Sequence, residues 1–309
     1  MKKYFVITID VEPDCSPTWH YSNPLTFHGV HEGIGHRLQP LFNKYNVCPT
    51  YLINNVVLED SQSTQTFLNL KGTYELGTHL HAEFMEPQKQ FNDYAGKKGE
   101  SNQCFLEPEV ELEKMRNITN LFEANFKKKP TSFRAGRFSA GVNTIKCLET
   151  LGYKVDTSVT PHVKWNDKTR KHPVDYISAP EQPYFIKESS YLEAGGQGKI
   201  LEVPVSIISG KKYFIKERPI WLRPYVSDFR DFSKVIERQS KSFQGNSNIV
   251  FNMMFHNVEV MPRLSPYPQT EKECEKYLGA LDAFLAFCEK NKIESINLSG
   301  LYDVFKRTV

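Results

Sequence analysis

A chain of 309 residues is long enough for one large barrel or for two ordinary domains. Hydrophobic residues make up 39% of it and aromatic residues 13%, which is enough to fill a core and to line a cleft. The formal net charge of only +3 excludes a strong electrostatic attraction to nucleic acid or to a membrane surface. No run of about 18 apolar residues occurs, so we expect no membrane span.

The cysteines and the N-terminal residues bear on the cellular compartment in which the protein is expected. Six cysteines are dispersed along the chain without the spacing of a metal site. The chain enters a strand-like run directly after Lys3, and this run lacks the character of a signal-peptide core. We therefore expect a cytoplasmic protein with reduced thiols.

Strands and helices are predicted to alternate along the chain. Strands are expected, in chain order, at residues 4–9, 48–53, 74–78, 131–133, around 155, 200–205, 249–255 and 293–298. Helices are expected at 30–45, 62–71, 108–127, 139–151, 228–243 and 271–290, with a short helix at the C-terminus. Loops are expected at 13–29 and at 82–106 beside an active site, and long loops or hairpins are expected at 160–200 over the mouth of a barrel. This alternation is typical of an α/β fold with a parallel sheet.

Polar side chains close several of the predicted strands. Asp10 and Glu12 end the first apolar run, and His79 and His81 follow the third. Three more residues stand at the ends of later strands, namely Arg134, Asp156 and His256. Because the active site of a β/α barrel gathers at the carboxyl ends of its strands, we expect these side chains to meet.

The spacing of these residues suits a metal centre. Asp10 and Glu12 are two residues apart, so on a strand both point to the same face. His79 and His81 have the same spacing, and Glu83 continues it. Carboxylates and imidazoles are the ligands that a hydrolytic metal ion needs.

Taken together, these residues resemble the polysaccharide deacetylase family, the NodB-homology carbohydrate esterases. Five motifs of that family occur in the expected order, and they cover most of the chain. They match Thr8-Ile9-Asp10-Val11-Glu12, Glu75-Leu76-Gly77-Thr78-His79, Phe133-Arg134-Ala135-Gly136-Arg137, Asp156 with Trp165, and Phe255-His256.

Three positions depart from the family pattern. Asp10-Val11-Glu12 replaces a pair of adjacent aspartates, and the resemblance then gives Glu12 to the metal. The second metal histidine of the family lies four residues after the first, where this chain has Glu83, while His81 stands two residues after. The ligands are therefore His79 with His81, or His79 with Glu83. Arg137 replaces a tyrosine that contributes its backbone N–H.

The resemblance implies a single domain over residues 1–309, a distorted, TIM-like (β/α) barrel of about seven strands. It implies a divalent metal, with zinc favoured and cobalt or nickel as alternatives, and an acetylated carbohydrate as substrate. Asp10 is the expected general base, held by Arg134. His256 is the expected acid for the leaving amine, oriented by Asp156.

The resemblance also suggests how the substrate is bound. The backbone N–H near Arg137 is expected to stabilise the oxyanion, and Trp165 and Tyr184 are expected to contact the sugar. Two other readings stay open. The chain is either an amidohydrolase acting on a non-sugar amide, or an inactive barrel that binds carbohydrate or a partner protein. The sequence does not indicate an oligomeric state.

Overall fold

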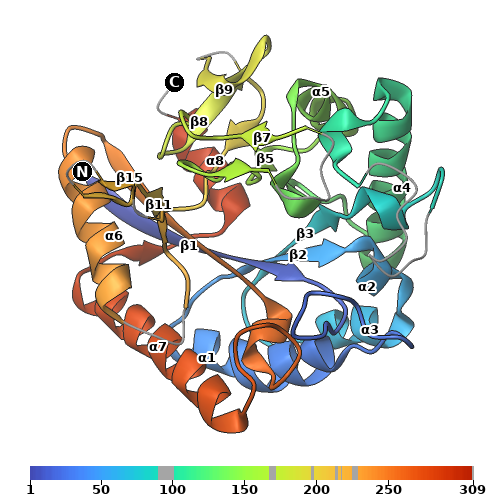
Figure 1. Cartoon of the computed structure of the whole chain (residues 1–309), viewed down its shortest axis with the longest axis horizontal. Helices are drawn as coiled ribbons and strands as arrows, with labels where there is room; N and C mark the ends of the chain where they lie inside the picture. The colour runs from blue at the N-terminus through green and yellow to red at the C-terminus, as the bar shows by residue number, and fades with distance from the viewer. Residues whose placement is uncertain are drawn as a thin grey trace.

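Seven parallel strands curl into a partial barrel (Figure 1). Their order is β15 (Asn248–His256), β1 (Lys2–Val11), β2 (Thr50–Asn54), β3 (Glu75–Leu80), β4 (Ser132–Ala135), β5 (Val155–Asp156) and β10 (Leu201–Glu202). The antiparallel strands β8 (Tyr184–Lys187) and β9 (Ser190–Ala194) extend the sheet beyond β10, and β16 (Glu294–Ser295) pairs with β1. The predicted distorted barrel of about seven strands is confirmed. This computed structural model describes residues 1–89, 101–166, 172–195, 198–212, 215–216, 218–224 and 229–307.

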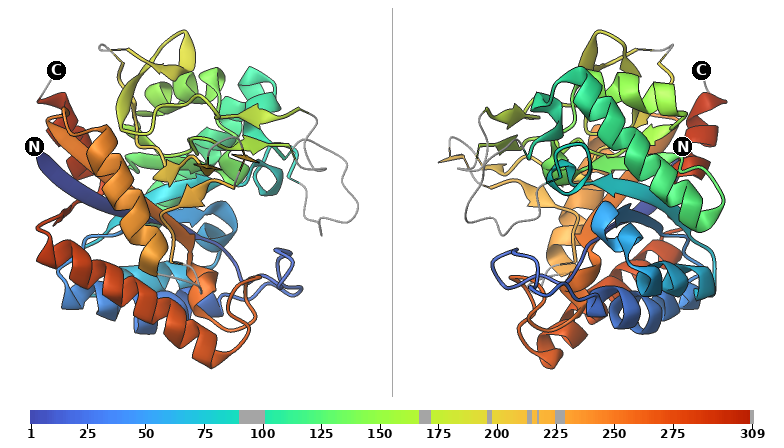
Figure 2. Two further views of the ribbon diagram at one scale, coloured as in Figure 1. Left: turned by 60° about the vertical axis from the view of Figure 1, so that its left-hand side comes forward. Right: turned by 90° about the vertical axis from the view of Figure 1, so that its right-hand side faces the viewer.

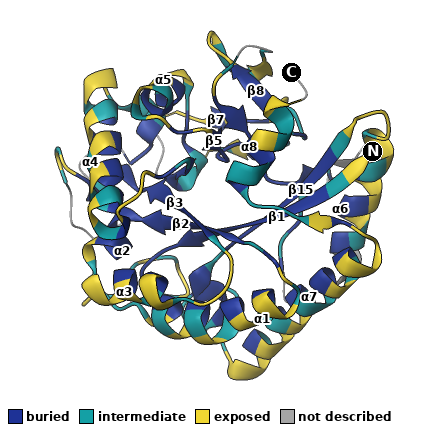
Figure 3. Ribbon diagram, turned by 180° about the vertical axis from the view of Figure 1, so that it is seen from behind, coloured by how far each residue is buried: buried dark blue, intermediate teal, exposed yellow. Residues whose placement is uncertain are grey.

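Helices cover the outside of the sheet (Figure 3). They are η1 (Gly29–Leu38) with α1 (Gln39–Lys44), α2 (Asn55–Glu59), α3 (Ser61–Asn69), α4 (Pro108–Phe126), α5 (Val142–Leu151), α6 (Phe229–Ser242) and α7 (Glu271–Lys290), whereas α8 (Leu298–Lys306) covers one end of the barrel. All of the predicted helices are present, and α2 is an addition. Helix α4 shows why the periodicity was informative, because Met115, Ile118 and Phe122 all face the core. It ends where Lys127 adopts a φ of 55°.

Short helical turns and hairpins make up most of the remaining regular structure. The turns are η2 (Ala82–Phe84), η3 (Gln103–Phe105), η4 (Gly136–Phe138) and η5 (Asn257–Val260). The hairpins pair β6 (Lys164–Trp165) with β7 (Val174–Asp175), β11 (Ile207–Ile208) with β14 (Ile220–Trp221), and β12 (Lys211–Lys212) with β13 (Ile215–Lys216). The predicted loop 82–106 contains η2 and η3 and is otherwise irregular where it is described, and its residues 90–100 lie outside the described part.

The edge strand β15 is joined to the segments before β8 and after β10 by hydrogen bonds, most of which involve side chains. Gln182 donates its amide to the carbonyl of Val250 (3.1 Å) and accepts from the N–H of the same residue (2.8 Å). Further along, the N–H of Ser206 donates to the carbonyl of Asn252 (2.9 Å), and Ser206 Oγ accepts from the Asn252 N–H (2.9 Å). These bonds satisfy buried backbone groups that a continuous ladder would otherwise pair.

The barrel interior is layered. The layer at the amino end of the strands is apolar, and helix α8 packs across that end of the barrel through Leu298, Leu301 and Tyr302 (Figure 3). Glu75 holds this helix by accepting hydrogen bonds from the N–H (3.0 Å) and Oγ (2.7 Å) of Ser299. The upper layers are polar, so the functional groups collect at the opposite, carboxyl end of the strands. No helix in the described ranges is both long and apolar enough to cross a bilayer.

Candidate active site

Polar side chains from three strands converge at the carboxyl end of the barrel. Strand β1 contributes Asp10 and Glu12 from its end, β3 leads into His79 and His81, and β15 ends at His256. The loops that follow β1 and η5 project on this side, away from the N-terminus (Figure 2, left). The fold therefore brings these five residues to the same end of the barrel, as the sequence predicted.

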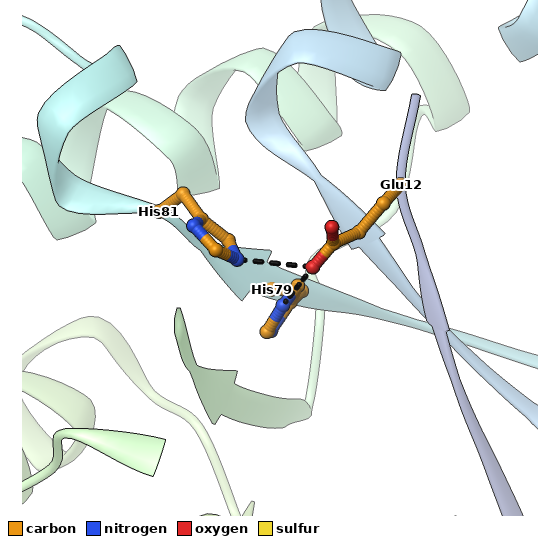
Figure 4. Close-up of side chains that lie close together, drawn as sticks. All are labelled: Glu12, His79 and His81. Carbon is orange, nitrogen blue, oxygen red and sulfur yellow. Dashed lines mark hydrogen bonds and ion pairs between the residues drawn. The ribbon is translucent and has the colours of Figure 1, made fainter. Parts of the chain in front are cut away.

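Glu12, His79 and His81 form one compact cluster (Figure 4). Glu12 Oε1 lies 3.1 Å from His79 Nε2 and 3.0 Å from His81 Nε2. All three side chains are buried, and their potential ligand atoms lie within 4.8 Å of one another. The other oxygen of Glu12 accepts a hydrogen bond from the hydroxyl of Tyr21 (3.3 Å).

The tautomer of His79 fits a cation at this point. His79 Nδ1 lies 3.1 Å from the carbonyl oxygen of Arg134, which can only accept, so Nδ1 carries the proton. The lone pair on Nε2 of a neutral His79 then faces an oxygen of Glu12. Two lone pairs at this distance repel each other unless a proton or a metal ion lies between them. Metal-binding histidines commonly donate their second N–H in this way.

His81 also faces Glu12 through Nε2, but its Nδ1 is buried without a hydrogen-bond partner among the described residues. The nearby carboxylate is that of Glu83, whose Oε1 lies 3.5 Å from Nδ1. Glu83 in turn accepts a hydrogen bond from the Arg137 guanidinium (2.8 Å). Of the two ligand sets left open by the sequence, the structure brings His79 together with His81. Glu83 lies outside the cluster.

Charges at this cluster are strongly coupled. Burial disfavours the protonated ring of His81, but the carboxylate of Glu12 raises the pKa of this ring to about 9. Burial also acts to raise the pKa of Glu12 and of Glu83, yet the neighbouring histidines hold both below their usual range, that of Glu83 at about 2. A carboxylate oxygen and two imidazole nitrogens are donors that Zn²⁺ accepts, and three protein ligands leave room for a fourth.

Asp10 stands beside the cluster and is fixed by Arg134. The Arg134 guanidinium donates to Asp10 Oδ1 (2.6 Å), and its Nε donates to the carbonyl of Thr157 (2.8 Å). Asp10 Oδ2 lies 3.9 Å from His79 Nε2 and 3.9 Å from His256 Nε2. Burial opposes ionisation of Asp10, but Arg134, His79 and His256 together lower its pKa. The carboxyl is therefore ionised at neutral pH.

His256 lies on the far side of Asp10. Its Nδ1 is 2.7 Å from Glu259 Oε1, so its Nε2 points towards Asp10. The ring of Trp19 packs against it, with centroids 4.7 Å apart. Glu259 was not singled out from the sequence, although its place three residues after His256 was a usable signal.

An aromatic surface, made of Phe138, Trp165 and Trp221, lies next to Arg134. The rings of Phe138 and Trp165 are stacked with centroids 5.4 Å apart, and Trp221 packs edge-on against Trp165 at 6.2 Å. The Arg134 guanidinium lies 5.8 Å from the centre of the Phe138 ring. The sequence predicted that Trp165 contacts the substrate, whereas Phe138 was not among the predicted site residues.

Two predicted residues do not reach the site. Val155 and Thr157 face the barrel interior, so Asp156 between them faces outwards. There it bonds to Tyr191 (2.5 Å) and Ser158 (2.7 Å) rather than to His256. Tyr184 is buried in the same outer region, where its hydroxyl donates to the carbonyl of Tyr191 (3.0 Å). The expectations that Asp156 orients His256 and that Tyr184 contacts a sugar are therefore wrong.

Comparison with known proteins tests the fold. No protein-family model matches the sequence, and no curated protein sequence matches it significantly. Among solved structures, a candidate polysaccharide deacetylase from Mycobacterium smegmatis aligns with 100% of this chain and 92% of its own, at 14% identity and a TM-score of 0.57. The chain has the fold of the polysaccharide deacetylases.

Other structures with this fold differ in chemistry. A candidate glycoside hydrolase/deacetylase from Parabacteroides distasonis aligns over 99% of this chain and 71% of its own, at 10% identity and a TM-score of 0.63. A GH57-type branching enzyme from Pyrococcus horikoshii aligns over the same shares, at 11% identity and a TM-score of 0.54. Since one fold carries different reactions, the activity has to be argued from the side chains.

Proposed function

We propose that this protein is a metal-dependent hydrolase that removes acetyl groups from an N-acetylated sugar or polysaccharide precursor. The observation that carries the proposal is the buried cluster of Glu12, His79 and His81, with Asp10 and His256 beside it. The fold is shared with a branching enzyme and does not by itself require two histidines to face one carboxylate. A metal-assisted hydrolase needs such a cluster to bind its ion.

Glu12, His79 and His81 would hold the ion, with zinc as the first candidate and cobalt or nickel as alternatives. When bound by these residues, a divalent ion would supply Lewis-acid chemistry, polarising the acyl carbonyl and lowering the pKa of the attacking water. The carbonyl of Arg134 keeps the His79 ring oriented through Nδ1, and the Glu83 carboxylate lies 3.5 Å from Nδ1 of His81.

Asp10 is the proposed general base. Its Oδ1 is engaged by Arg134, so Oδ2 is the oxygen that faces the reacting water. The Arg134 side chain is already held in one orientation, because its guanidinium also donates hydrogen bonds to Thr157 and Thr8. The base is therefore held in place before substrate arrives, which lowers the cost of reaching the transition state.

His256 is the proposed general acid, and it donates the proton from Nε2 to the leaving amine. The turn after β4 is the proposed donor of the oxyanion N–H, since Arg137 adopts a φ of 56° there while its side chain is bound to Glu83. The surface of Phe138, Trp165 and Trp221 suits the apolar face of a sugar ring.

The test is acetate release from a panel of N-acetylated sugars by the metal-loaded protein, compared with Asp10→Asn. The amide keeps an acceptor for Arg134 but cannot take a proton. We expect acetate release to fall by about 100-fold or more, while the variant still binds one ion per chain. The exposed substitution His36→Asn serves as the control.

Undiminished acetate release by Asp10→Asn would contradict the assigned base. Bound metal without acetate release from any sugar in the panel would favour the non-sugar amide or the binding-only barrel.

A further inference from the structure

Glu259 is a buried carboxylate beside the site that takes no part in the proposed hydrolysis. Glu259 lies in η5, three residues after His256, and its side chain turns back onto that residue. Glu259 Oε1 accepts a hydrogen bond from the backbone N–H of His256 (2.9 Å) and lies 2.7 Å from His256 Nδ1. A single oxygen therefore fixes both the backbone and the ring of His256.

Two further residues hold this carboxylate. The Arg223 guanidinium bonds to both of its oxygens, and the hydroxyl of Tyr277 donates to Oε2 (2.8 Å). All of these groups are largely shielded from water, with Glu259 fully buried. Burial acts to raise the pKa of Glu259, but Arg223 and His256 lower it to about 2, so the group is a carboxylate at neutral pH.

The ring nitrogens of His256 can be assigned from these contacts. Arg223 also approaches Nδ1, at 3.4 Å, which would require a lone pair on that nitrogen. The carboxylate is much closer, at 2.7 Å, and it can only accept. Nδ1 therefore carries a proton, and Nε2 is the nitrogen that faces Asp10 at 3.9 Å.

We propose that Glu259 is the positioning residue of His256, in the place that the sequence had suggested for Asp156. It selects the tautomer that leaves Nε2 towards the substrate, and its negative charge stabilises the ring when Nε2 is protonated. Arg223 and Tyr277 keep the carboxylate from turning away. The inference rests on the proposed function, because it assigns His256 as the acid of that reaction.

The activity test uses the dependence on the leaving group. An aryl acetate releases a phenolate that needs no proton, whereas an N-acetyl sugar releases an amine that does. For Glu259→Gln we expect about a 100-fold loss of kcat on the amide and little change on the aryl ester. In a His256→Gln background, Glu259→Gln should have no additional effect. Glu271→Gln, an exposed change of the same kind, is the control.

Equal losses on both substrates, or full additivity with His256→Gln, would overturn the proposal. A second measurement does not need activity. In ¹⁵N-labelled protein, the Nδ1-bound proton of His256 should give a signal shifted far downfield by the carboxylate, and Glu259→Gln should move it back. A wild-type His256 protonated on Nε2 alone would refute the inference, even if acetate release had confirmed the hydrolase. A shifted signal without acetate release would leave the pair intact and reject only the reaction.

Discussion

Metal binding to the native state should raise the Tm, and the size of the chain sets how large this rise is for a given gain in the free energy of unfolding. An ion that binds only the native state at 100 times its Kd adds about 2.7 kcal/mol to the free energy of unfolding. At roughly 2.1 cal/mol/K per residue, the 309 residues give an unfolding entropy of about 0.65 kcal/mol/K. Zinc added to metal-free protein should therefore raise Tm by about 4 °C.

His81→Ala is the perturbation that isolates the site. It removes one of the three donors, and it leaves Glu12 facing only His79. We expect the zinc-dependent rise in Tm to fall below about 1 °C, because a carboxylate and one imidazole bind zinc weakly at the same free concentration. His36→Ala is the matched control, since His36 is an exposed histidine that pairs with Glu32 on η1.

The assay is differential scanning calorimetry of chelator-treated protein, with and without zinc, together with metal content per chain. A rise in Tm that survives in His81→Ala would refute the cluster as the binding site. So would a rise lost equally in His36→Ala. Absence of any rise with zinc, cobalt or nickel in the wild type would remove the metal from the proposed reaction.

Three further outcomes follow from other parts of the structure. Burial raises the pKa of Asp156, and burial together with the nearby Asp156 carboxyl raises the pKa of Glu202. Their contribution to stability is therefore present below about pH 4 and is lost as pH rises. In urea unfolding, the free energy of unfolding of Glu202→Gln should decline less between pH 5 and 8 than that of the wild type, and an identical decline would contradict the coupling. Trp165→Ala should raise KM for the sugar by about three- to tenfold at unchanged kcat, whereas a lower kcat at unchanged KM would argue against stacking. Gly77→Ala would place a Cβ 2.3 Å from Ser132 Oγ and should cost about 1–3 kcal/mol in urea unfolding, while Gly279→Ala, which meets nothing within 4 Å on α7, should not destabilise.

The choice between His81 and Glu83 as metal ligands could not be made from the spacing of residues alone. Spacing by two put His79, His81 and Glu83 on one face of an extended strand. The backbone stays extended through His81, at φ −89° and ψ 99°, and then turns into η2. Glu83 therefore leaves the strand periodicity and meets Arg137 instead of the cluster. Where a strand ends depends on what packs around it, and the apolar pattern does not record that.

Asp156 was misplaced for a related reason. Strand β5 has only two residues, so a shift of one position reverses which side chains face the interior. Thr157 takes the inward position, where its Oγ1 accepts from Arg134 (3.1 Å), and Asp156 is left on the outer side. In such a short strand, the sequence carries too few alternating residues to fix the face.

The sequence by itself determined the order of strands and helices and the polar residues that close the strands. Those features follow from periodicities of two and 3.6 residues, which neighbouring side chains report directly. Only the tertiary structure decided that Glu12 lies between His79 and His81, and that Glu259 rather than Asp156 contacts His256. These contacts join residues that are either far apart in the chain or separated by a turn. Their geometry is set by the closure of the barrel.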